Sequence, residues 1–427
     1  MTDVIVAGAG AAGLAAAHRL ARAGLKTLVL EGRDRPGGRI CTTLSDEAPA
    51  SFELGAEFIH GSKNAALDLA AEAGRHVKEI HDEHWIADDG RLRPAREIYQ
   101  GITDYFTGVD LEGPDLSFDQ FLRRSPAPNE WFLRMFVEGF DAADTSLVSA
   151  QALARAELSD DDGEDRDFRV QGGYVHLVDW LHGGIEAADG QIHLSAVIQT
   201  INWREGAVEV IAETDDGRQI LHASQAIITV PLSILKAPPG QPRAIRFLPA
   251  LREKERALAG LEMGHIVKAS FLFDEPFWSS HIGKEDFGFI HAREGAYRTW
   301  WSRPDAPILT GWVGGPPAAA LPRVQLLDLA IHELREIFGR SEADLRRLLR
   351  DWRFHDWSAD PFSGGAYSYT RVGGLSAPDD LARPIANTLF FAGEATASGP
   401  AQGTVHGALA SGFRAANQAL EIVCPSK

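Results

Sequence analysis

The chain has 427 residues, of which 42 are Lys or Arg and 60 are Asp or Glu, so its formal net charge is −18. Binding to phosphate backbones depends on clustered Lys and Arg, so this balance excludes a general nucleic-acid-binding protein and disfavours docking on anionic lipid. It is compatible with a positively charged small substrate. At about 150 residues per domain, the length predicts two or three domains.

Only two cysteines, Cys41 and Cys424, are present, and they cannot form a disulfide framework or a Cys-x-x-Cys metal motif. The chain runs into an apolar strand at Asp3 with no basic signal segment before it. Its longest apolar runs, such as residues 226–235, are far shorter than a membrane span of about 20 residues. We therefore expect a reduced, cytoplasmic protein with no membrane or metal partner.

The N-terminus has the pattern of a βαβ unit. Residues 3–7 predict a buried strand, residues 14–23 a helix that ends at Gly24, and residues 27–30 a second strand. Between the first strand and the helix, three glycines allow a tight turn, a close approach to a pyrophosphate and helix–strand packing; these are Gly8, Gly10 and Gly13. Glu31 follows the second strand, where a carboxylate accepts hydrogen bonds from a ribose diol.

A second strand–turn–helix unit lies near the C-terminus. Residues 388–394 predict a buried strand that ends in Gly393 and Glu394, and a helix follows from Val405 to Ile422. The N-terminus of such a helix favours negative charge. A further glycine pair and an arginine, Gly37-Gly38-Arg39, follow Glu31. Two dinucleotide-type sites at opposite ends of the chain fit one extended FAD better than NAD.

These motifs together resemble those of the flavin-containing amine oxidases, which comprise monoamine oxidases, polyamine oxidases, L-amino-acid oxidases and lysine-specific histone demethylases. The resemblance covers most of the chain. Its segments are residues 8–13, 31, 37–39, 54–61, 170–173, 228–232, 268–278, 357–369 and 391–394.

Two segments are similar to the polyamine oxidase branch: the loop from Gly55 to Gly61 and the helix start from Gly403 to Gly407. Monoamine oxidases place a tyrosine near the position of Thr404 and attach FAD through a cysteine just before the position of Tyr367. This chain has Ala366 before Tyr367. The resemblance therefore implies a non-covalent FAD and an incomplete aromatic cage.

The resemblance also implies the fold: a mixed α/β protein in which a Rossmann-like FAD-binding domain is interleaved with a substrate domain built from a sheet and helices. The expected FAD-binding domain comprises residues 1–84, 187–250 and 356–427, and the expected substrate domain residues 85–186 and 251–355. Alternation predicts strands at 194–203 and 207–211 in the first, and at 266–273 and 307–313 in the second. Helices are expected at 129–140 and 323–338.

The motifs and the resemblance together assign the candidate site residues. Val197, at the position whose backbone meets adenine in the family, can alternatively be an ordinary core valine. The expected cofactor-binding residues are Gly8, Gly10, Ala12, Gly13, Glu31, Gly32, Arg33, Gly38, Arg39, Gly55, Ala56, Glu57, Val197, Gly393, Glu394, Thr404 and Val405.

Lys268, His60 and Tyr367 are the expected catalytic residues. The family counterpart of Lys268 holds a water next to flavin N5, whereas the alternative is a strand-edge lysine that reaches solvent. His60 is expected to line a substrate tunnel or to be a structural histidine. Glu57 is also a weaker candidate for contacting a cation.

A reacting amine must be neutral, although a free alkyl amine is largely protonated at neutral pH, as the Lys pKa of about 10.4 indicates. A dry aromatic pocket lowers the pKa of such an amine by desolvation. Tyr367 is the firmest wall of that pocket, and Trp300, Trp301 and Trp352 are candidates that can equally be core residues. An acidic stretch, residues 141–165, is interpreted as a solvated loop face.

The sequence thus predicts an FAD-dependent amine oxidase of the polyamine oxidase type, with oxygen as the electron acceptor and an aldehyde and a shorter amine as products. A monoamine oxidase or an L-amino-acid oxidase is the alternative within the family. A non-catalytic flavoprotein or a demethylase-like peptide binder is a further alternative. The oligomeric state, the oxidised C–N bond and the preference between free and acetylated polyamines stay open.

Overall fold

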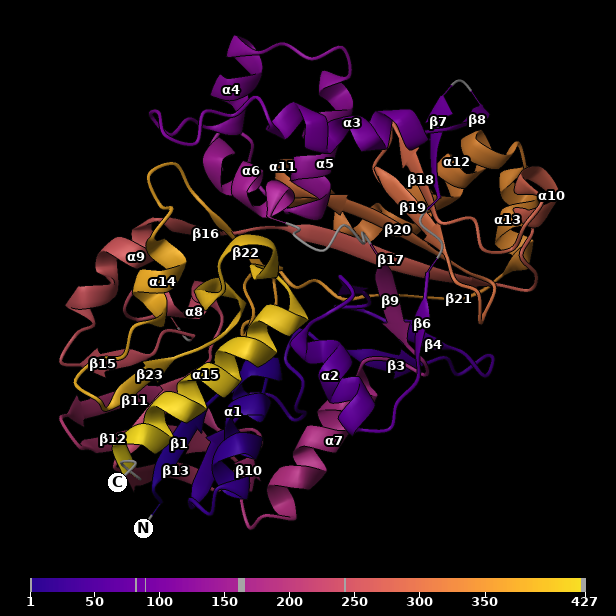
Figure 1. Cartoon of the computed structure of the whole chain (residues 1–427). Helices are drawn as coiled ribbons and strands as arrows, with labels where there is room; N and C mark the ends of the chain where they lie inside the picture. The colour runs from indigo at the N-terminus through magenta and orange to yellow at the C-terminus, as the bar shows by residue number, and fades with distance from the viewer. Residues whose placement is uncertain (1, 81–82, 89, 160–165, 242, 424–427) are drawn as a thin grey trace.

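A computed structural model describes residues 2–80, 83–88, 90–159, 166–241 and 243–423. In Figure 1 the N-terminal strands and the C-terminal helix gather at one end of the molecule, and a second large sheet lies at the other end. The mixture of parallel and antiparallel sheets with covering helices confirms the predicted fold class.

A five-stranded parallel sheet forms the first end. Its strands belong to distant parts of the chain, in the order β10 (Gln191–His193), β2 (Thr27–Leu30), β1 (Val4–Ala7), β14 (Gln225–Ile228) and β23 (Leu389–Phe391). Every residue of β1, β2, β14 and β23 is buried, as expected when both faces of a parallel sheet are covered. The two strands predicted near the N-terminus are therefore present, with β2 at its predicted bounds.

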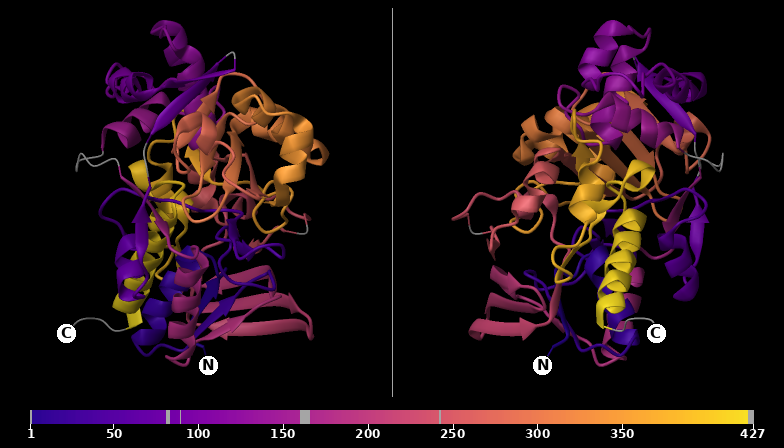
Figure 2. Two further views of the ribbon diagram at one scale, coloured as in Figure 1. Left: turned by 90° about the vertical axis from the view of Figure 1, so that its right-hand side faces the viewer. Right: turned by 60° about the vertical axis from the view of Figure 1, so that its left-hand side comes forward.

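The helices α1 (Ala11–Arg22), α2 (Ala65–Glu72), α7 (Val175–Glu186) and α15 (Val405–Val423) share one apolar core with the parallel sheet. Side chains alternate along a strand, so Val4 and Val6 of β1 pack in this core, whereas Ile5 and Ala7 pack in a second core on the other face. The helices α1 and α15 pack closely, as Figure 2 also shows. A Cβ at Gly412 of α15 would lie 2.2 Å from the carbonyl oxygen of Ala12, so glycine permits this approach.

The second face of the parallel sheet is covered by a four-stranded sheet in the order β13 (Gly217–Ala223), β12 (Ala207–Thr214), β11 (Val197–Arg204) and β15 (Arg246–Leu248). The strand predicted over residues 194–203 is present as β11 but begins three residues later, because the chain turns at Ser195, whose φ is 51°. This turn separates β10 from β11 and brings Val197 to the start of a strand.

A seven-stranded sheet forms the other end of the molecule. Its order is β21 (Leu349–Phe354), β17 (Ile266–Phe273), β20 (Ile308–Gly314), β19 (Thr299–Ser302), β18 (Phe289–Ala292), β7 (His84–Asp88) and β8 (Arg91–Pro94). Strand β17 has its predicted bounds and is buried throughout. Val267, Ala269 and Phe271 pack under α12 (Leu326–Phe338) and α13 (Glu342–Leu348). Lys268 therefore points to the opposite face of the sheet.

A group of helices with its own apolar core packs beside this sheet: α3 (Arg96–Phe106), α4 (Phe118–Arg124), α5 (Glu130–Phe140) and α6 (Ala150–Leu158). Helix α5 agrees with the helix predicted over 129–140. The predicted helix over 323–338 begins as a 3-10 turn at Arg323–Gln325 and continues as α12.

Shorter elements connect the two ends. Small sheets are formed by β3 (Thr42–Leu44) with β4 (Ser51–Glu53), by β5 (Ile59–His60), β9 (Asp167–Val170) and β6 (Val77–Glu79), and by β16 (Leu261–Met263) with β22 (Ser368–Thr370). The short helices are α8 (Leu232–Leu235), α9 (Glu255–Ala259), α10 (Ser279–Ile282), α11 (Gly315–Ala320) and α14 (Ala377–Ala382). The remaining 3-10 turns are Arg252–Lys254, Glu394–Thr396 and Gly399–Ala401. The chain passes between the two large sheets several times, and the predicted domain boundaries stay a prediction.

Candidate active site

A cavity of about 1510 Å³ takes its walls from the parallel sheet, the seven-stranded sheet and the helical group. Nearly all of the site residues predicted from the sequence line it. They are Gly8, Gly10, Ala12, Glu31, Gly32, Arg33, Gly38, Arg39, Gly55, Ala56, Glu57, His60, Val197, Lys268, Tyr367, Gly393, Glu394, Thr404 and Val405. The cavity thus brings together residues that the sequence places hundreds of positions apart.

Gly13 is the exception, because it does not line the cavity. A Cβ at Gly13 would lie 1.9 Å from the carbonyl oxygen of Gly8 and 2.8 Å from Oγ1 of Thr229. Gly13 therefore packs α1 against the turn, which is the helix-packing role expected of the third glycine. Among the predicted cofactor-binding residues, Gly13 therefore supports the site without lining it.

The N-terminus of α1 opens into the cavity. Gly10, Ala11 and Ala12 all line it, and within 4 Å of a Cβ built on Gly10 no protein atom is found. Free backbone N–H groups and the partial positive charge of a helix N-terminus suit a phosphate group. This end of the cavity therefore fits the pyrophosphate of a dinucleotide.

Glu31 is 5% exposed and lies on the cavity wall at the end of β2. Its Oε2 accepts a hydrogen bond of 2.7 Å from the N–H of Ala9, and its Oε1 accepts one of 3.0 Å from the N–H of Arg33. A carboxylate has about four acceptor sites, so Glu31 retains acceptor capacity for a ribose diol.

Arg33 makes its principal contacts with the protein. Its Nη2 donates to Oδ1 of Asp360 at 2.6 Å and to Oγ of Ser363 at 2.9 Å, and its guanidinium lies over the ring of Phe362. Burial opposes ionisation of Asp360, but the hydrogen bond from His355 and the charge of Arg33 hold its pKa well below the usual range. The side chain of Arg33 thus links the end of β2 to the segment before β22, and it supports the cavity wall through these contacts.

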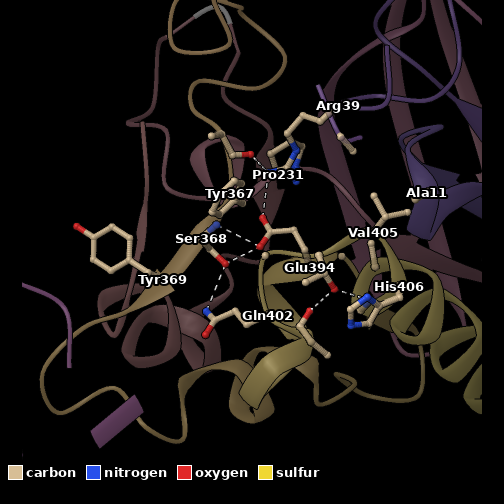
Figure 3. Close-up of a pocket in the computed structure, with 18 of the residues that line it drawn as sticks. Ala11, Arg39, Pro231, Tyr367, Ser368, Tyr369, Glu394, Gln402, Val405 and His406 are labelled. Atoms are coloured by element: carbon tan, nitrogen blue, oxygen red, sulfur yellow. Dashed lines mark hydrogen bonds and ion pairs between the residues drawn. The ribbon is translucent and has the colours of Figure 1, made fainter. Parts of the chain in front are cut away.

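At the other end of the cavity, Glu394 binds two neighbours, as Figure 3 shows. Its Oε1 accepts from Nη1 of Arg39 at 3.0 Å, and its Oε2 accepts from Oγ and the N–H of Ser368 at 2.7 and 3.2 Å. Arg39 also donates to the carbonyl oxygen of Ala366, just before Tyr367. Glu394 and Arg39 therefore hold the Tyr367 segment against the cavity.

The N-terminus of α15 also faces the cavity. Oγ1 of Thr404 accepts the N–H of Gly407 at 2.9 Å, which caps the first turn of the helix. Val405 and His406 line the cavity next to it, near Glu394 in Figure 3. Two helix N-termini, those of α1 and α15, thus face one cavity, as expected for an extended anionic cofactor.

Lys268 and Glu57 form a buried ion pair, with Nζ 2.7 Å from Oε2 and exposed side-chain fractions of 3% and 4%. Nζ of Lys268 also donates to the carbonyl oxygen of Gly55 at 3.0 Å. Burial would raise the pKa of Glu57, but the charges of Lys268 and of nearby arginines lower it to about 2. Lys268 is therefore not a strand-edge lysine that reaches solvent.

Aromatic side chains lie near Lys268 and Glu57, in the part of the cavity that we call its reactive end. Tyr367, Trp301 and Trp312 line the cavity, and the rings of Trp301 and Trp312 are 5.7 Å apart. Two of the tryptophan candidates do not line it: Trp300 is fully buried beside Phe271, and Trp352 stacks on the same Phe271 ring. These two are core residues. Alternation along β19 separates Trp300 from Trp301, and one sequence cannot tell which of the two faces the cavity.

Part of the cavity wall is acidic, which was not predicted from the sequence. Asp141, at the C-terminal end of α5, and Glu157, on α6, both line the cavity. Burial and the charge of Glu157 raise the pKa of Asp141 to about 7. Asp141 belongs to the acidic stretch that was interpreted as a solvated face, and for Asp141 that interpretation is wrong. Glu157 is partly buried and accepts a hydrogen bond of 2.6 Å from Oγ1 of Thr103. Residues 160–165 of this stretch lie outside the described residues.

His60 lies at the rim of the cavity, with half of its side chain exposed. Its Nδ1 is 2.7 Å from Oδ1 of Asp167. Burial opposes ionisation of Asp167, but the charge and hydrogen bond of His60 lower the pKa of that carboxyl. His60 is thus oriented by a carboxylate where it lines the cavity.

Two further findings concern the part of the chain that the structure describes. Within it, no three His, Cys, Asp or Glu side chains are grouped so that they could hold a metal ion. Over the same residues, every helix is too short or too polar to cross a membrane.

Comparisons with known proteins agree with this geometry. Residues 11–420 match the sequence model of the flavin-containing amine oxidoreductases. The chain is 30% identical to lysine-specific histone demethylase 1 homolog 2 of Arabidopsis thaliana, over 98% of this chain and 58% of that protein. It is 28% identical to human lysine-specific histone demethylase 2, over 97% of this chain and 53% of that protein. The chain thus spans little more than half the length of these relatives.

Among solved structures, wild-type putrescine oxidase bound to putrescine has a similar fold, with a TM-score of 0.80 and 21% identity over 99% of both chains. At this level of identity the likeness concerns the fold alone.

Proposed function

The chain belongs to the family of flavin-containing amine oxidoreductases, and on this premise we propose that it oxidises a polyamine or a related diamine. It is an enzyme that acts on amines with a flavin, and FAD is its cofactor, as the sequence predicts. The finer assignment is the substrate. In the proposed reaction a C–N bond is oxidised to an imine, and oxygen takes up the two electrons as hydrogen peroxide. Water hydrolyses the imine to an aldehyde and a shorter amine, or to an aldehyde and ammonia where a primary amine reacts.

The observation that carries the substrate proposal is the unpaired acid on the cavity wall. Within the described residues, the Asp141 side chain makes no hydrogen bond or ion pair, and its charge adds to burial in raising the pKa of the Tyr367 phenol. An acid that protein cations leave unpaired destabilises the fold, and such costs are tolerated mainly at functional sites. A second ammonium group on the substrate would pair with Asp141 and Glu157.

The residues fit FAD. Where Gly10 leaves room for a pyrophosphate, the N-terminus of α1 would hold it, Glu31 would accept the ribose diol, and the start of α15 would face the flavin end. The bound flavin supplies the acceptor for the hydride that leaves the substrate carbon. Among the described residues on the cavity wall there is no cysteine, in accordance with the predicted non-covalent attachment.

The substrate end of the cavity would lower the pKa of the reacting ammonium. Tyr367, Trp301 and Trp312 offer apolar ring faces rather than water, and desolvation disfavours the charged form of an amine. The Tyr367 hydroxyl donates to the carbonyl oxygen of Phe140 at 2.6 Å, which fixes its ring. We assign His60, oriented by Asp167, to receive the released proton at the rim of the cavity.

A second candidate is oxidation of a methylated lysine in a peptide, because the sequence relatives described above are named lysine-specific histone demethylases. The exposed position of His60 at the rim leaves room for a side chain that enters from a larger molecule. The acidic wall suits a lysine-rich peptide as well as a polyamine, so only turnover distinguishes these substrates.

The experiment is a peroxide assay over spermidine, spermine, their acetylated forms, putrescine, benzylamine, leucine and a methyl-lysine peptide. Turnover of free polyamines or putrescine well above the others supports the proposal. Turnover of benzylamine or leucine alone would reject it, and turnover of the peptide alone would establish the second candidate. Anaerobic addition of each amine, followed by the flavin band near 450 nm, separates slow reduction from slow reoxidation.

A further inference from the structure

Glu57 lies where three segments of the chain meet at the reactive end of the cavity. Its Oε2 pairs with Nζ of Lys268 at 2.7 Å on β17, and its Oε1 accepts from Nε of Arg169 at 2.8 Å on β9 and from Nε1 of Trp301 at 3.2 Å on β19. Both oxygens are therefore used by groups that belong to strands, while Glu57 itself is on the loop after β4. Three protein groups thus occupy most of the acceptor sites of the Glu57 carboxylate, and Glu57 lines the cavity.

Several charged side chains lie around this carboxylate. Lys268, Arg169 and Arg303 are the cations that act on Glu57, and Glu53 is the other carboxylate nearby. Arg303 has its own partner, because it donates to Asp305 at 3.0 and 2.5 Å. Glu53 is held by Oγ1 of Thr42 and by the N–H of Tyr174, and it does not contact Lys268 directly. Glu57 is thus the direct anionic partner of Lys268 among the described residues.

The position of Lys268 disfavours its ammonium form. Nζ of Lys268 is surrounded by the ring of Trp301 and by backbone, and burial lowers the pKa of Lys268 while the charge of Glu57 opposes that fall. A lysine has three N–H donors, of which Gly55 and Glu57 take two in the described structure. These two contacts fix the orientation of the ammonium group and so the direction of its third N–H. Lys268 lines the cavity.

We propose that Glu57 is a positioning residue that keeps Lys268 in its ammonium form and aims its remaining N–H into the cavity. The inference rests on the proposed function, because an ammonium donor beside the reactive end serves amine oxidation. A fixed positive charge there stabilises negative charge as it develops on the cofactor and on oxygen. In its neutral form, Lys268 would lose that charge and would become an acceptor.

The test uses the FAD-loaded enzyme with Glu57→Gln, which keeps the shape of the side chain and removes its charge. The matched control is Glu53→Gln, which removes a carboxylate of similar burial that does not contact Lys268. Two readouts are followed from pH 6 to 10: the position of the oxidised flavin band, and the rate of flavin reoxidation by oxygen. We expect Glu57→Gln to gain a titration in both readouts with a midpoint more than about one pH unit below that of wild type.

Stability provides a readout that is independent of turnover. A lysine whose pKa is lower in the folded than in the unfolded protein makes the folded state more stable as pH rises between the two values. The urea midpoint of the FAD-loaded Glu57→Gln variant should therefore rise more steeply with pH than that of wild type. In the double variant Lys268→Met with Glu57→Gln, this extra rise should vanish, because the titrating group is gone.

Should Glu57→Gln fail to fold, Glu57→Asp replaces it. Aspartate keeps the charge but shortens the side chain by one methylene, so the titration midpoint should stay near that of wild type while reoxidation slows. Titrations of Glu57→Gln and Glu53→Gln that coincide with wild type would overturn the inference, as would a Glu57→Gln effect that persists with Met at position 268. If the extra titration is present but no amine is oxidised, the proposed function fails and the role of Glu57 stands.

Discussion

Replacement of Asp141 by Asn should weaken the capture of diamines and at the same time stabilise the protein. Asp141 lies on the cavity wall with its pKa raised to about 7 by burial and by the charge of Glu157, so it is largely ionised at pH 8. The neutral asparagine has nearly the same shape. The variant therefore removes one charge from the cavity and little else.

The magnitude follows from two separate effects. A hydrogen bond to a charged group contributes about 1.5–3 kcal/mol, so the KM of putrescine or spermidine at pH 8 should rise about 10- to 100-fold. For the stability effect, the difference between the ordinary pKa of 3.8 and about 7 corresponds to at most about 4 kcal/mol. Screening by water in the cavity reduces this figure, and we expect a gain of about 1–2 kcal/mol at pH 8.

The sign of the pH dependence can be derived. Because the folded protein keeps the Asp141 proton up to about pH 7 and the unfolded chain releases it near pH 3.8, the folded state binds more protons in between. Wild type therefore loses stability relative to the asparagine variant as pH rises through this window. The difference between their urea midpoints should be small near pH 4 and largest above pH 7.

The assay combines steady-state kinetics at pH 8 with urea unfolding of the FAD-loaded protein from pH 4 to 8. Asp104→Asn is the control, because Asp104 is an exposed acid on α3 that does not line the cavity. The KM of a monoamine such as benzylamine should change less than about threefold. An equal rise in KM for monoamines and diamines, or a loss of stability at pH 8, would refute the reasoning.

Three further predictions concern the cofactor site and the charge. Gly13→Ala should destabilise the protein by about 1–3 kcal/mol, because its Cβ would lie 1.9 Å from the Gly8 oxygen. Gly10→Ala should leave the urea midpoint unchanged and lower the FAD content on purification. Equal effects of the two variants would contradict the assignment. Arg33→Lys should lower the free energy of unfolding, measured with urea, by about 1–3 kcal/mol near neutral pH. Arg33 lowers the pKa of Asp360, so this loss should shrink in acid as Asp360 becomes protonated. A loss of stability that does not depend on pH would contradict the role of this ion pair. The kcat/KM of spermidine should fall more steeply with ionic strength than that of benzylamine, because the protein's net charge of −18 attracts the more highly charged amine more strongly. Equal salt dependence for the two amines would show that the net charge does not attract the substrate.

Much of the cofactor site could be predicted from one sequence because its determinants are local. The turn after β1, the acid after β2 and the helix that begins at Val405 each depend on residues a few positions apart. Backbone sterics and helix termini give such segments the same geometry in any context. Gly13 is the instructive case: it lies in the motif as expected, but it packs against Gly8 and does not line the cavity.

The substrate end was less predictable because its determinants are not local. Trp300 and Trp301 are neighbours in sequence and lie on opposite faces of β19, and which face meets the cavity depends on sheet packing. The same holds for Asp141. The acidic composition of its segment indicated a solvated position, but the packing of α5 beside the seven-stranded sheet places Asp141 on the cavity wall.

The net charge of −18 excluded nucleic acid as a partner. The local motifs determined the family, the cofactor and the positions of the dinucleotide-binding turns. The tertiary structure decided which acids face the cavity and which cation each of them meets. Glu57 and Lys268 are 211 residues apart in sequence, and only the fold brings their charges within 2.7 Å. Coulomb energy depends on distance and burial, and neither is set by the sequence near a charged residue.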